Sequence, residues 1–96
     1  MRKSNDQTIG EVIKDLIEQY RLEGKLNSIK IINSWQDVVG DMIHRHTKNL
    51  YVKNRTLFVS LDSAALKNEL SFAKSKIIKA LNEKVGTESI KDIVFH

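Results

Sequence analysis

Apolar residues recur every three or four positions at the start of the chain, which is the spacing of an amphipathic helix. The first stripe comprises Ile9, Val12, Ile13, Leu16, Ile17 and Tyr20. Thr8 and Glu11 fit a capping box at its start, in which the threonine hydroxyl accepts a hydrogen bond from a first-turn amide. Gly24 follows the stripe, and glycine readily adopts the positive φ found just past a helix end. The pattern therefore predicts a first helix over about residues 9–22.

A second apolar stripe follows on a new face and predicts a helix over about residues 26–45. Its members are Leu26, Ile29, Ile32, Trp35, Val38, Val39, Met42 and Ile43. Gly40 lies inside this helix, where glycine costs about 1 kcal/mol relative to alanine, and it marks a bend or a close contact. The only tryptophan, Trp35, lies on the stripe, which favours an anchor of the core over a platform for stacking a base.

The period changes to two from Asn49 onward, as is typical of β-strands. Asn54 and Arg55 separate two alternating runs, so the pattern predicts a β-hairpin. One face carries the aliphatic residues Leu50, Val52, Leu57, Val59 and Leu61. Tyr51 and Phe58 belong to the opposite face.

Helical spacing returns after Ser63, which suits a helix cap, and predicts a third helix over about residues 64–84 that stops at Gly86. Residues 90–95 form a last short strand. Because a strand, helix and strand cross over right-handedly, we expect the last strand to run parallel to the second hairpin strand. Whether it lies beside that strand or beyond the first stays open. The predicted order α-α-β-β-α-β gives an α+β fold with a three-stranded mixed sheet covered by helices.

The chain of 96 residues is expected to form one compact domain over residues 8–96, preceded by a polar arm over residues 1–7. It contains no proline and no cysteine, so neither a disulfide framework nor a thiolate metal site exists. No apolar run reaches the roughly 20 residues that span a bilayer, and the first residues lack the apolar run of a signal peptide. We therefore expect a cytoplasmic protein with no membrane partner.

The net charge of +4 comes from one short segment. Residues 44–55 hold four of the 16 basic side chains and none of the 12 acidic ones, so the remaining residues hold 12 of each. Tyr51 is interleaved with these basic residues, a combination that single-strand binders use for backbone attraction and base stacking. The predicted nucleic-acid-binding residues are Arg45, Lys48, Tyr51, Lys53 and Arg55. The alternative is a solvated hairpin whose lysines discourage edge-to-edge aggregation.

Catalytic and metal-binding chemistry finds little support in the sequence. His44 and His46 are two apart, which places them on one face of a strand but not of a helix end. Ser60, Ser63 and Ser71 lack a Gly-x-Ser-x-Gly context, and the four glycines lie too far apart for a phosphate-binding loop. We expect no enzyme activity, no metal and no cofactor.

Several sequence blocks, taken in order, resemble the bacterial DciA family of replicative-helicase loaders or operators, long catalogued as a domain of unknown function. These blocks are residues 35–40, His46-Thr47, residues 57–65, residues 69–72, Leu81-Asn82 with Gly86, and residues 90–95. The resemblance implies a KH-like domain, DNA binding and contact with a DnaB-type replicative helicase at replication initiation. The chain has no Gly-x-x-Gly loop, the element with which KH domains grip nucleic acid.

Two functions follow as hypotheses. The first is a non-enzymatic adaptor that binds DNA, with RNA as an open alternative, through the basic hairpin. The second is a protein-interaction module whose basic hairpin recognises an acidic partner surface without touching nucleic acid. Homo-oligomerisation through an exposed sheet edge is a further hypothesis.

Overall fold

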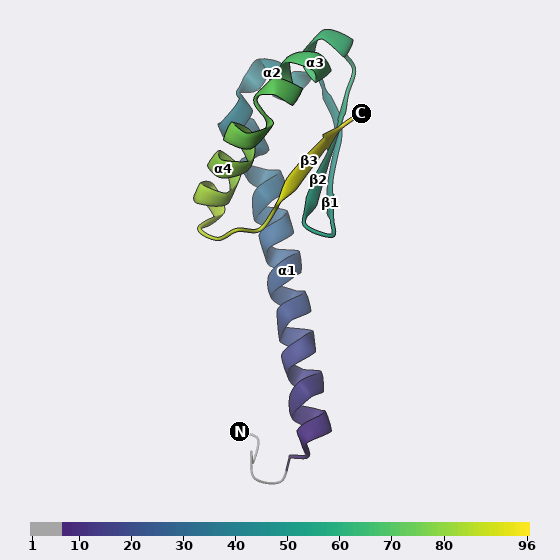
Figure 1. Cartoon of the computed structure of the whole chain (residues 1–96), viewed down its shortest axis with the longest axis vertical. Helices are drawn as coiled ribbons and strands as arrows, with labels where there is room; N and C mark the ends of the chain where they lie inside the picture. The colour runs from purple at the N-terminus through teal and green to yellow at the C-terminus, as the bar shows by residue number, and fades with distance from the viewer. Residues whose placement is uncertain (1–6) are drawn as a thin grey trace.

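The computed structural model describes residues 7–96 and shows a small helix-and-sheet domain from which one long helix projects (Figure 1). Its elements are α1 (Ile9–Val39), α2 (Asp41–Arg45), β1 (Thr47–Lys53), β2 (Thr56–Leu61), α3 (Ala64–Phe72), α4 (Lys74–Val85) and β3 (Asp92–Phe95). The predicted arm over residues 1–7 falls outside the described residues, except for Gln7.

The first two predicted helices are one helix, so the predicted break at Gly24 is wrong. α1 runs unbroken for 31 residues from its Thr8 cap, whose hydroxyl accepts from the Glu11 amide at 3.1 Å as predicted. Gly24 stays helical because strong helix formers flank it, and its cost of about 1 kcal/mol is offset by avoiding two helix ends. Leu26 and Ile29, which suggested a new face, are exposed instead.

Gly40 ends α1, so the helix predicted to reach residue 45 is interrupted there. Its φ of +90° lies in a region that favours glycine. The chain then turns into the short helix α2, whose C-terminal residues lead directly into β1. The bend predicted at Gly40 is thus a complete break between two helices.

The predicted hairpin and the parallel last strand are confirmed. β1 and β2 pair antiparallel, β2 and β3 pair parallel, and the strand order β1-β2-β3 places the last strand beside the second. Asn54 and Arg55 form the hairpin turn with φ values of 52° and 59°, as a two-residue turn of the mirror-image type requires. Lys48 lies at an irregularity in the β1–β2 register.

The third predicted helix is also divided, at Ala73, into α3 and α4. The Ser71 hydroxyl donates to the Asn68 carbonyl at 2.6 Å, just before this break. The division lets α3 lie against β2 and β3 while α4 packs along α1. The two predicted ends are confirmed, since Ser63 caps α3 and Gly86 ends α4 with a left-handed conformation.

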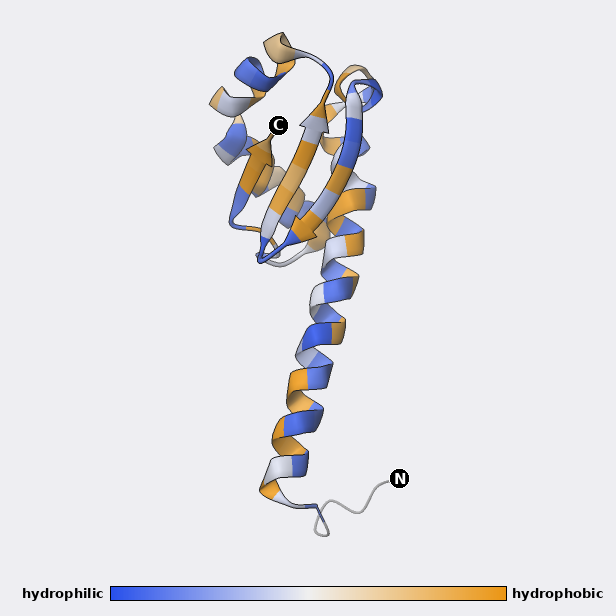
Figure 2. Cartoon of the chain, turned by 90° about the vertical axis from the view of Figure 1, so that its right-hand side faces the viewer, coloured by the Kyte–Doolittle hydropathy of each residue, from blue (hydrophilic) through white to orange (hydrophobic). Residues whose placement is uncertain are grey.

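The hydrophobic core lies between one face of the sheet and the helices α1 and α4. Trp35 is fully buried, as predicted, and its Nε1 donates to Thr47 Oγ1 at 3.0 Å. The other buried residues are Ile31, Leu57, Val59, Leu61, Leu70, Ile77, Leu81, Ile90 and Ile93. Figure 2 shows that no helix covers the opposite face of the sheet. The α+β class with a three-stranded mixed sheet is confirmed, and within residues 7–96 no helix is long and apolar enough to cross a membrane.

Candidate nucleic-acid interface

The four predicted basic residues are spread along one edge of the sheet. Arg45 ends α2, Lys48 and Lys53 lie in β1, and Arg55 lies in the hairpin turn. β1 pairs only with β2, so its outer edge is free of backbone partners in the described part of the chain. Because a strand rises about 3.3 Å per residue, the two ends of β1 lie about 20 Å apart. The structure therefore forms an elongated basic edge and not a single basic cluster.

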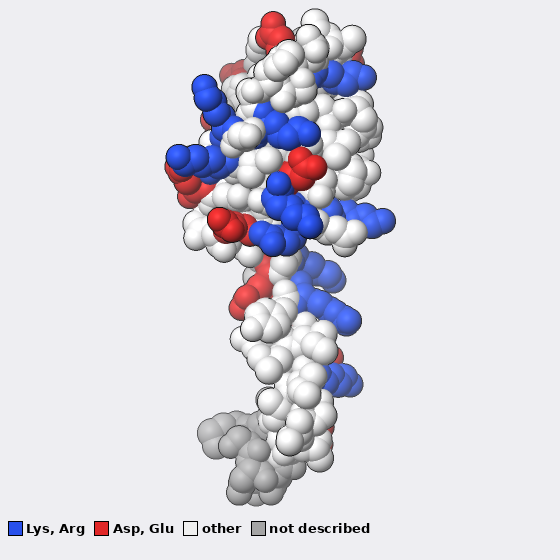
Figure 3. Space-filling view, viewed as in Figure 1, with Lys and Arg blue, Asp and Glu red and all other residues white. Residues whose placement is uncertain are grey.

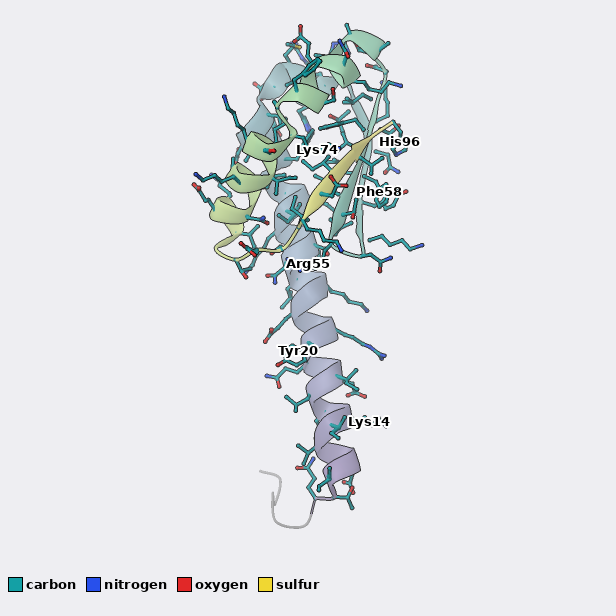
Figure 4. All side chains as sticks on the ribbon, viewed as in Figure 1. Lys14, Tyr20, Arg55, Phe58, Lys74 and His96 are labelled. Carbon is teal, nitrogen blue, oxygen red and sulfur yellow. The ribbon has the colours of Figure 1, made fainter. Side chains whose placement is uncertain are left out.

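An aromatic pair stands on the uncovered face of the sheet. The rings of Tyr51 and Phe58 stack with their centroids 4.7 Å apart and their planes 10° from parallel. The strand register places Tyr51 opposite Phe58 and Phe58 opposite Val94, so one apolar row crosses all three strands. Tyr51 is 42 % exposed. Figure 4 labels Phe58 on the side of the sheet that faces away from α4.

Lys53 follows Tyr51 by two residues in β1 and therefore projects from the same sheet face. Neither Lys53 nor Arg45 has an ion-pair partner among the interactions of residues 7–96. Both side chains are exposed. Of the predicted residues, Tyr51 and Lys53 thus lie together, and Arg45, which has no ion pair within residues 7–96, lies beyond the other end of the strand.

Asp62 neutralises part of the charge at the start of β1. Its carboxylate lies 3.2 Å from Lys48 Nζ and 2.7 Å from His46 Nδ1. The hydrogen bond from His46, followed by that from Lys48, lowers the pKa of Asp62 below its ordinary value of 3.8. Asp62 lies outside the basic segment in sequence, but the hairpin returns it to that segment's beginning. The charge count along the chain could not reveal this pairing.

Arg55 is held within the protein. Its guanidinium donates to the Glu88 carbonyl at 2.9 Å, and its own carbonyl accepts from the Lys91 amide at 2.8 Å. Both bonds join the hairpin turn to the loop before β3. Figure 4 shows the labelled Arg55 at this lower end of the sheet. Arg55 therefore has a structural role that its place in a basic run did not indicate.

Other charged regions of the domain are mixed. Figure 3 shows Lys and Arg over α4 interspersed with acidic side chains. Lys74 and Lys84 are paired with Asp92 and Asp37, at 3.5 and 3.8 Å. Residues 7–96 contain no cluster of three or more potential metal ligands. Residues 44–55 hold four basic residues and no acidic one, against three, Lys74, Lys76 and Lys79, in the acid-free stretch 70–82.

Sequence reasoning did not include Phe58 or Val94 in the site. Strand alternation already placed Phe58 on the Tyr51 face, so that signal was present in the sequence. Val94 joins the row only through the β2–β3 register, which local sequence does not determine. The candidate site is therefore the aromatic row Tyr51–Phe58–Val94 with Lys53, flanked along β1 by the other basic residues.

Three of the family-like sequence blocks have clear structural roles. Trp35 bonds Thr47, whose hydroxyl donates to the Ile43 carbonyl at 2.8 Å, so α1, α2 and β1 are joined. The Asn82 amide donates to the Ile90 carbonyl at 2.8 Å, and its oxygen accepts from the Ser89 and Ile90 amides at 3.0 Å. Asn82 thereby fixes the loop that leads into β3.

Comparisons with known proteins support the family resemblance that these blocks suggested. The chain is 25 % identical over 87 residues to a UPF0232 protein of Corynebacterium glutamicum (strain R), and the match covers 91 % of this chain and 49 % of that protein. The chain thus spans about half the length of this curated relative. Residues 8–95 match the family described as Dna[CI] antecedent, DciA. The match covers nearly the whole described domain, and the chain belongs to the DciA family.

Proposed function

We propose that this domain is a non-enzymatic adaptor that binds single-stranded DNA along β1 and the uncovered face of the sheet. The observation that carries the proposal is the coincidence of two features on one strand. β1 lies within the basic segment, residues 44–55, that supplies the whole charge excess, and its Tyr51 stacks on Phe58 of β2 on a face that no helix covers.

The basic residues and the aromatic pair contribute to binding in different ways. Arg45 and Lys53 attract the phosphate backbone at the two ends of β1. Bases stack on the free side of the aromatic pair, an interaction worth about 1–3 kcal/mol per base. The row Tyr51–Phe58–Val94 holds no acidic residue, and Asp92 in the next row lies 3.5 Å from Lys74 Nζ. Binding is sequence-tolerant, because phosphates and base faces carry little sequence information.

The dependence of binding affinity on salt concentration measures the number of phosphate contacts. Four contacts give a slope of log affinity against log salt of about −3 to −4, because each contact contributes about −0.7 to −0.9. If Lys48 stays paired with Asp62 and Arg55 with Glu88, two contacts remain and the slope falls to about −1.5. Fluorescence anisotropy with single-stranded DNA, duplex DNA and RNA measures the slope for each. We expect the shallower slope and the tightest binding for single-stranded DNA.

A matched pair of variants locates the interface. R45Q with K53Q removes two unpaired cations of the hairpin edge, and K76Q with K79Q removes two cations of α4. We expect the first pair to weaken binding at least tenfold and the second to leave it nearly unchanged. Y51A alone should also weaken binding relative to the wild type, because it removes the stacking surface. It should leave the salt slope unchanged, because it removes no charge. Equal losses from both double variants would refute the assignment to β1.

Arg55 needs a separate substitution because its backbone is in the left-handed region. R55A removes the charge at the backbone strain of about 1–2 kcal/mol that Arg55 already bears, whereas R55G removes the charge and also relaxes the turn. We expect R55G to stay folded and to bind single-stranded DNA nearly as well as the wild type. A large loss of binding would show that Arg55 leaves the Glu88 carbonyl to contact phosphate.

Family membership supports a place in DNA replication, with a DnaB-type replicative helicase as the protein partner. The adaptor would hold single-stranded DNA near the helicase without catalysing a reaction itself. Co-purification with the helicase after nuclease treatment tests this contact directly. Loss of the helicase after nuclease treatment would mean that DNA bridges the two proteins.

One observation favours a second function, that of a protein-interaction module. Two of the four basic residues are engaged internally, and the free edge of β1 offers backbone groups to which an extended acidic peptide can add as a strand. In that case helicase capture survives nuclease treatment and no nucleic acid binds at low salt. Anisotropy and co-purification together separate the two functions.

A further inference from the structure

The first half of α1 projects beyond the other helices and the sheet. The molecule measures 59 × 20 × 20 Å, and its radius of gyration of 17.3 Å exceeds the roughly 12.5 Å of a compact chain of this length. From residue 8 to residue 26 every side chain is exposed except that of Asp15, which is half-buried. Figure 1 shows this segment extending away from the sheet and the other helices.

One side of the projecting segment is apolar. The six residues of the stripe Ile9, Val12, Ile13, Leu16, Ile17 and Tyr20 are between 42 % and 79 % exposed. Ile13 lies 18 residues, or five helical turns, before the core residue Ile31, and Tyr20 lies 18 residues before Val38, which packs against the core. The stripe thus continues the side of α1 that faces the core, and Figure 2 shows it along one side of the projecting helix.

The spacing of the stripe is the same read in either direction. Its central residues Ile9, Ile13, Leu16 and Tyr20 are separated by four, three and four positions. In an antiparallel pair of such helices, Ile9 of one copy lies opposite Tyr20 of the other, and Ile13 lies opposite Leu16. We propose that this stripe is the interface of a two-fold symmetric homodimer in which the projecting halves of two α1 helices pack antiparallel.

The position of the domain selects this direction. The sheet and α4 lie on the stripe side of α1, but only along its C-terminal half. Two parallel helices packed through their stripes would bring both domains into the same space. An antiparallel pair places the domains at opposite ends and lets the N-terminal end of each helix approach the hairpin end of the other domain. The two-fold axis closes the assembly at two copies.

The available area sets the strength of the dimer. Six partly exposed side chains offer on the order of 600 Å² per copy, or about 1,200 Å² for the pair, the lower limit of a standard specific interface. We therefore expect a dissociation constant in the micromolar range. The stripe shares no residue with the candidate nucleic-acid interface, although the N-terminal end of the partner helix approaches the hairpin end of the sheet, where Lys53 lies.

Sedimentation equilibrium of the full chain over a concentration series tests the proposal. The wild type should pass from monomer to dimer, and L16K should remain monomeric at every concentration. L22K is the matched control, because Leu22 is exposed on the opposite side of the same helix and receives the same substitution. Fluorescence of the single buried tryptophan confirms that each variant is folded. A monomeric wild type, or an equal effect of both variants, overturns the proposal.

Cysteine cross-linking tests the direction, since the chain has no native cysteine. Chains carrying I13C are mixed with chains carrying L16C and oxidised. The antiparallel pair predicts that the mixed disulfide forms in excess over both homodisulfides. An excess of the homodisulfides would indicate parallel helices and overturn the proposed arrangement.

Discussion

The two halves of α1 share one helix and one apolar side but differ in what that side meets. In the C-terminal half, Ile31 and Trp35 are fully buried against the sheet and α4. In the N-terminal half, Ile13 and Ile17 occupy the same side 18 residues earlier and stay about half exposed. Apolar spacing therefore predicts a helix and its contact face, but it does not reveal whether the contact lies within the chain.

Removing equivalent side chains from the two halves of α1 gives the largest expected difference in stability between them. W35A should cost about 3–5 kcal/mol, because it leaves a large cavity in the core. I17A, five turns earlier on the same side, should cost less than about 0.5 kcal/mol in the monomer. Urea unfolding followed by circular dichroism at low protein concentration measures both.

W35F provides the control for the larger effect. It keeps most of the buried ring but removes the hydrogen bond to Thr47, so its cost should lie well below that of W35A. If I17A proved as destabilising as W35A, the projecting half would fold as part of the domain and the comparison would fail.

The variant N82A tests how much stability the packed half of α1 gains from α4 and β3, which cover it. N82A removes three hydrogen bonds, and two of them belong to Ile90, which is almost fully buried. We expect a cost of about 2–3 kcal/mol from the unsatisfied backbone groups. N68A, at an exposed position of α3, is the matched control and should change the unfolding free energy by less than about 0.5 kcal/mol. Similar costs at both positions would argue against the Asn82 clamp.

Local sequence signals predicted helix caps and the hairpin better than they predicted the boundaries between consecutive helices. The Thr8 and Ser63 caps, the Gly86 stop and the hairpin follow from residues within a few positions of one another, and the structure confirms them. The boundary at Gly24 failed because helix-forming neighbours outweigh one glycine. The break at Ala73 depends on how two helices fit over the sheet, which the local pattern does not determine.

The candidate site was predictable in composition but not in electrostatics. Sequence alternation placed Tyr51 and Phe58 on one face, and the structure shows them stacked. The partners of Lys48 and Arg55 lie 14 and 33 residues away in sequence, at Asp62 and Glu88. Such partners depend on the return of the hairpin and the position of the last loop, so counting charges along the chain overestimates the free basic residues.

Removing a helix cap from each region tests the same difference between packed and projecting parts, with a smaller expected effect. S63A removes the cap of packed α3 and should lower the unfolding free energy by about 1 kcal/mol. T8A removes the cap of projecting α1, where fraying of the first turns does not reach the core. We expect T8A to reduce the helical circular dichroism signal slightly and to leave the urea midpoint nearly unchanged. Equal midpoint shifts would show that the projecting half is coupled to the domain.

The smallest expected effect is a pH dependence that belongs to the packed domain alone. The pKa of Asp62 is lowered, chiefly by the His46 hydrogen bond, so its ionised form is favoured in the folded state. This contribution is fully present above the ordinary pKa of 3.8 and is lost as the pH falls through the lower, folded value. The Tm of the wild type should therefore exceed that of D62N at neutral pH, and the two should converge below about pH 4. The exposure of Asp62 keeps the difference small. Thermal unfolding of both proteins across this range checks the expectation, and a constant Tm difference would assign the effect to a contact other than the ionised carboxylate.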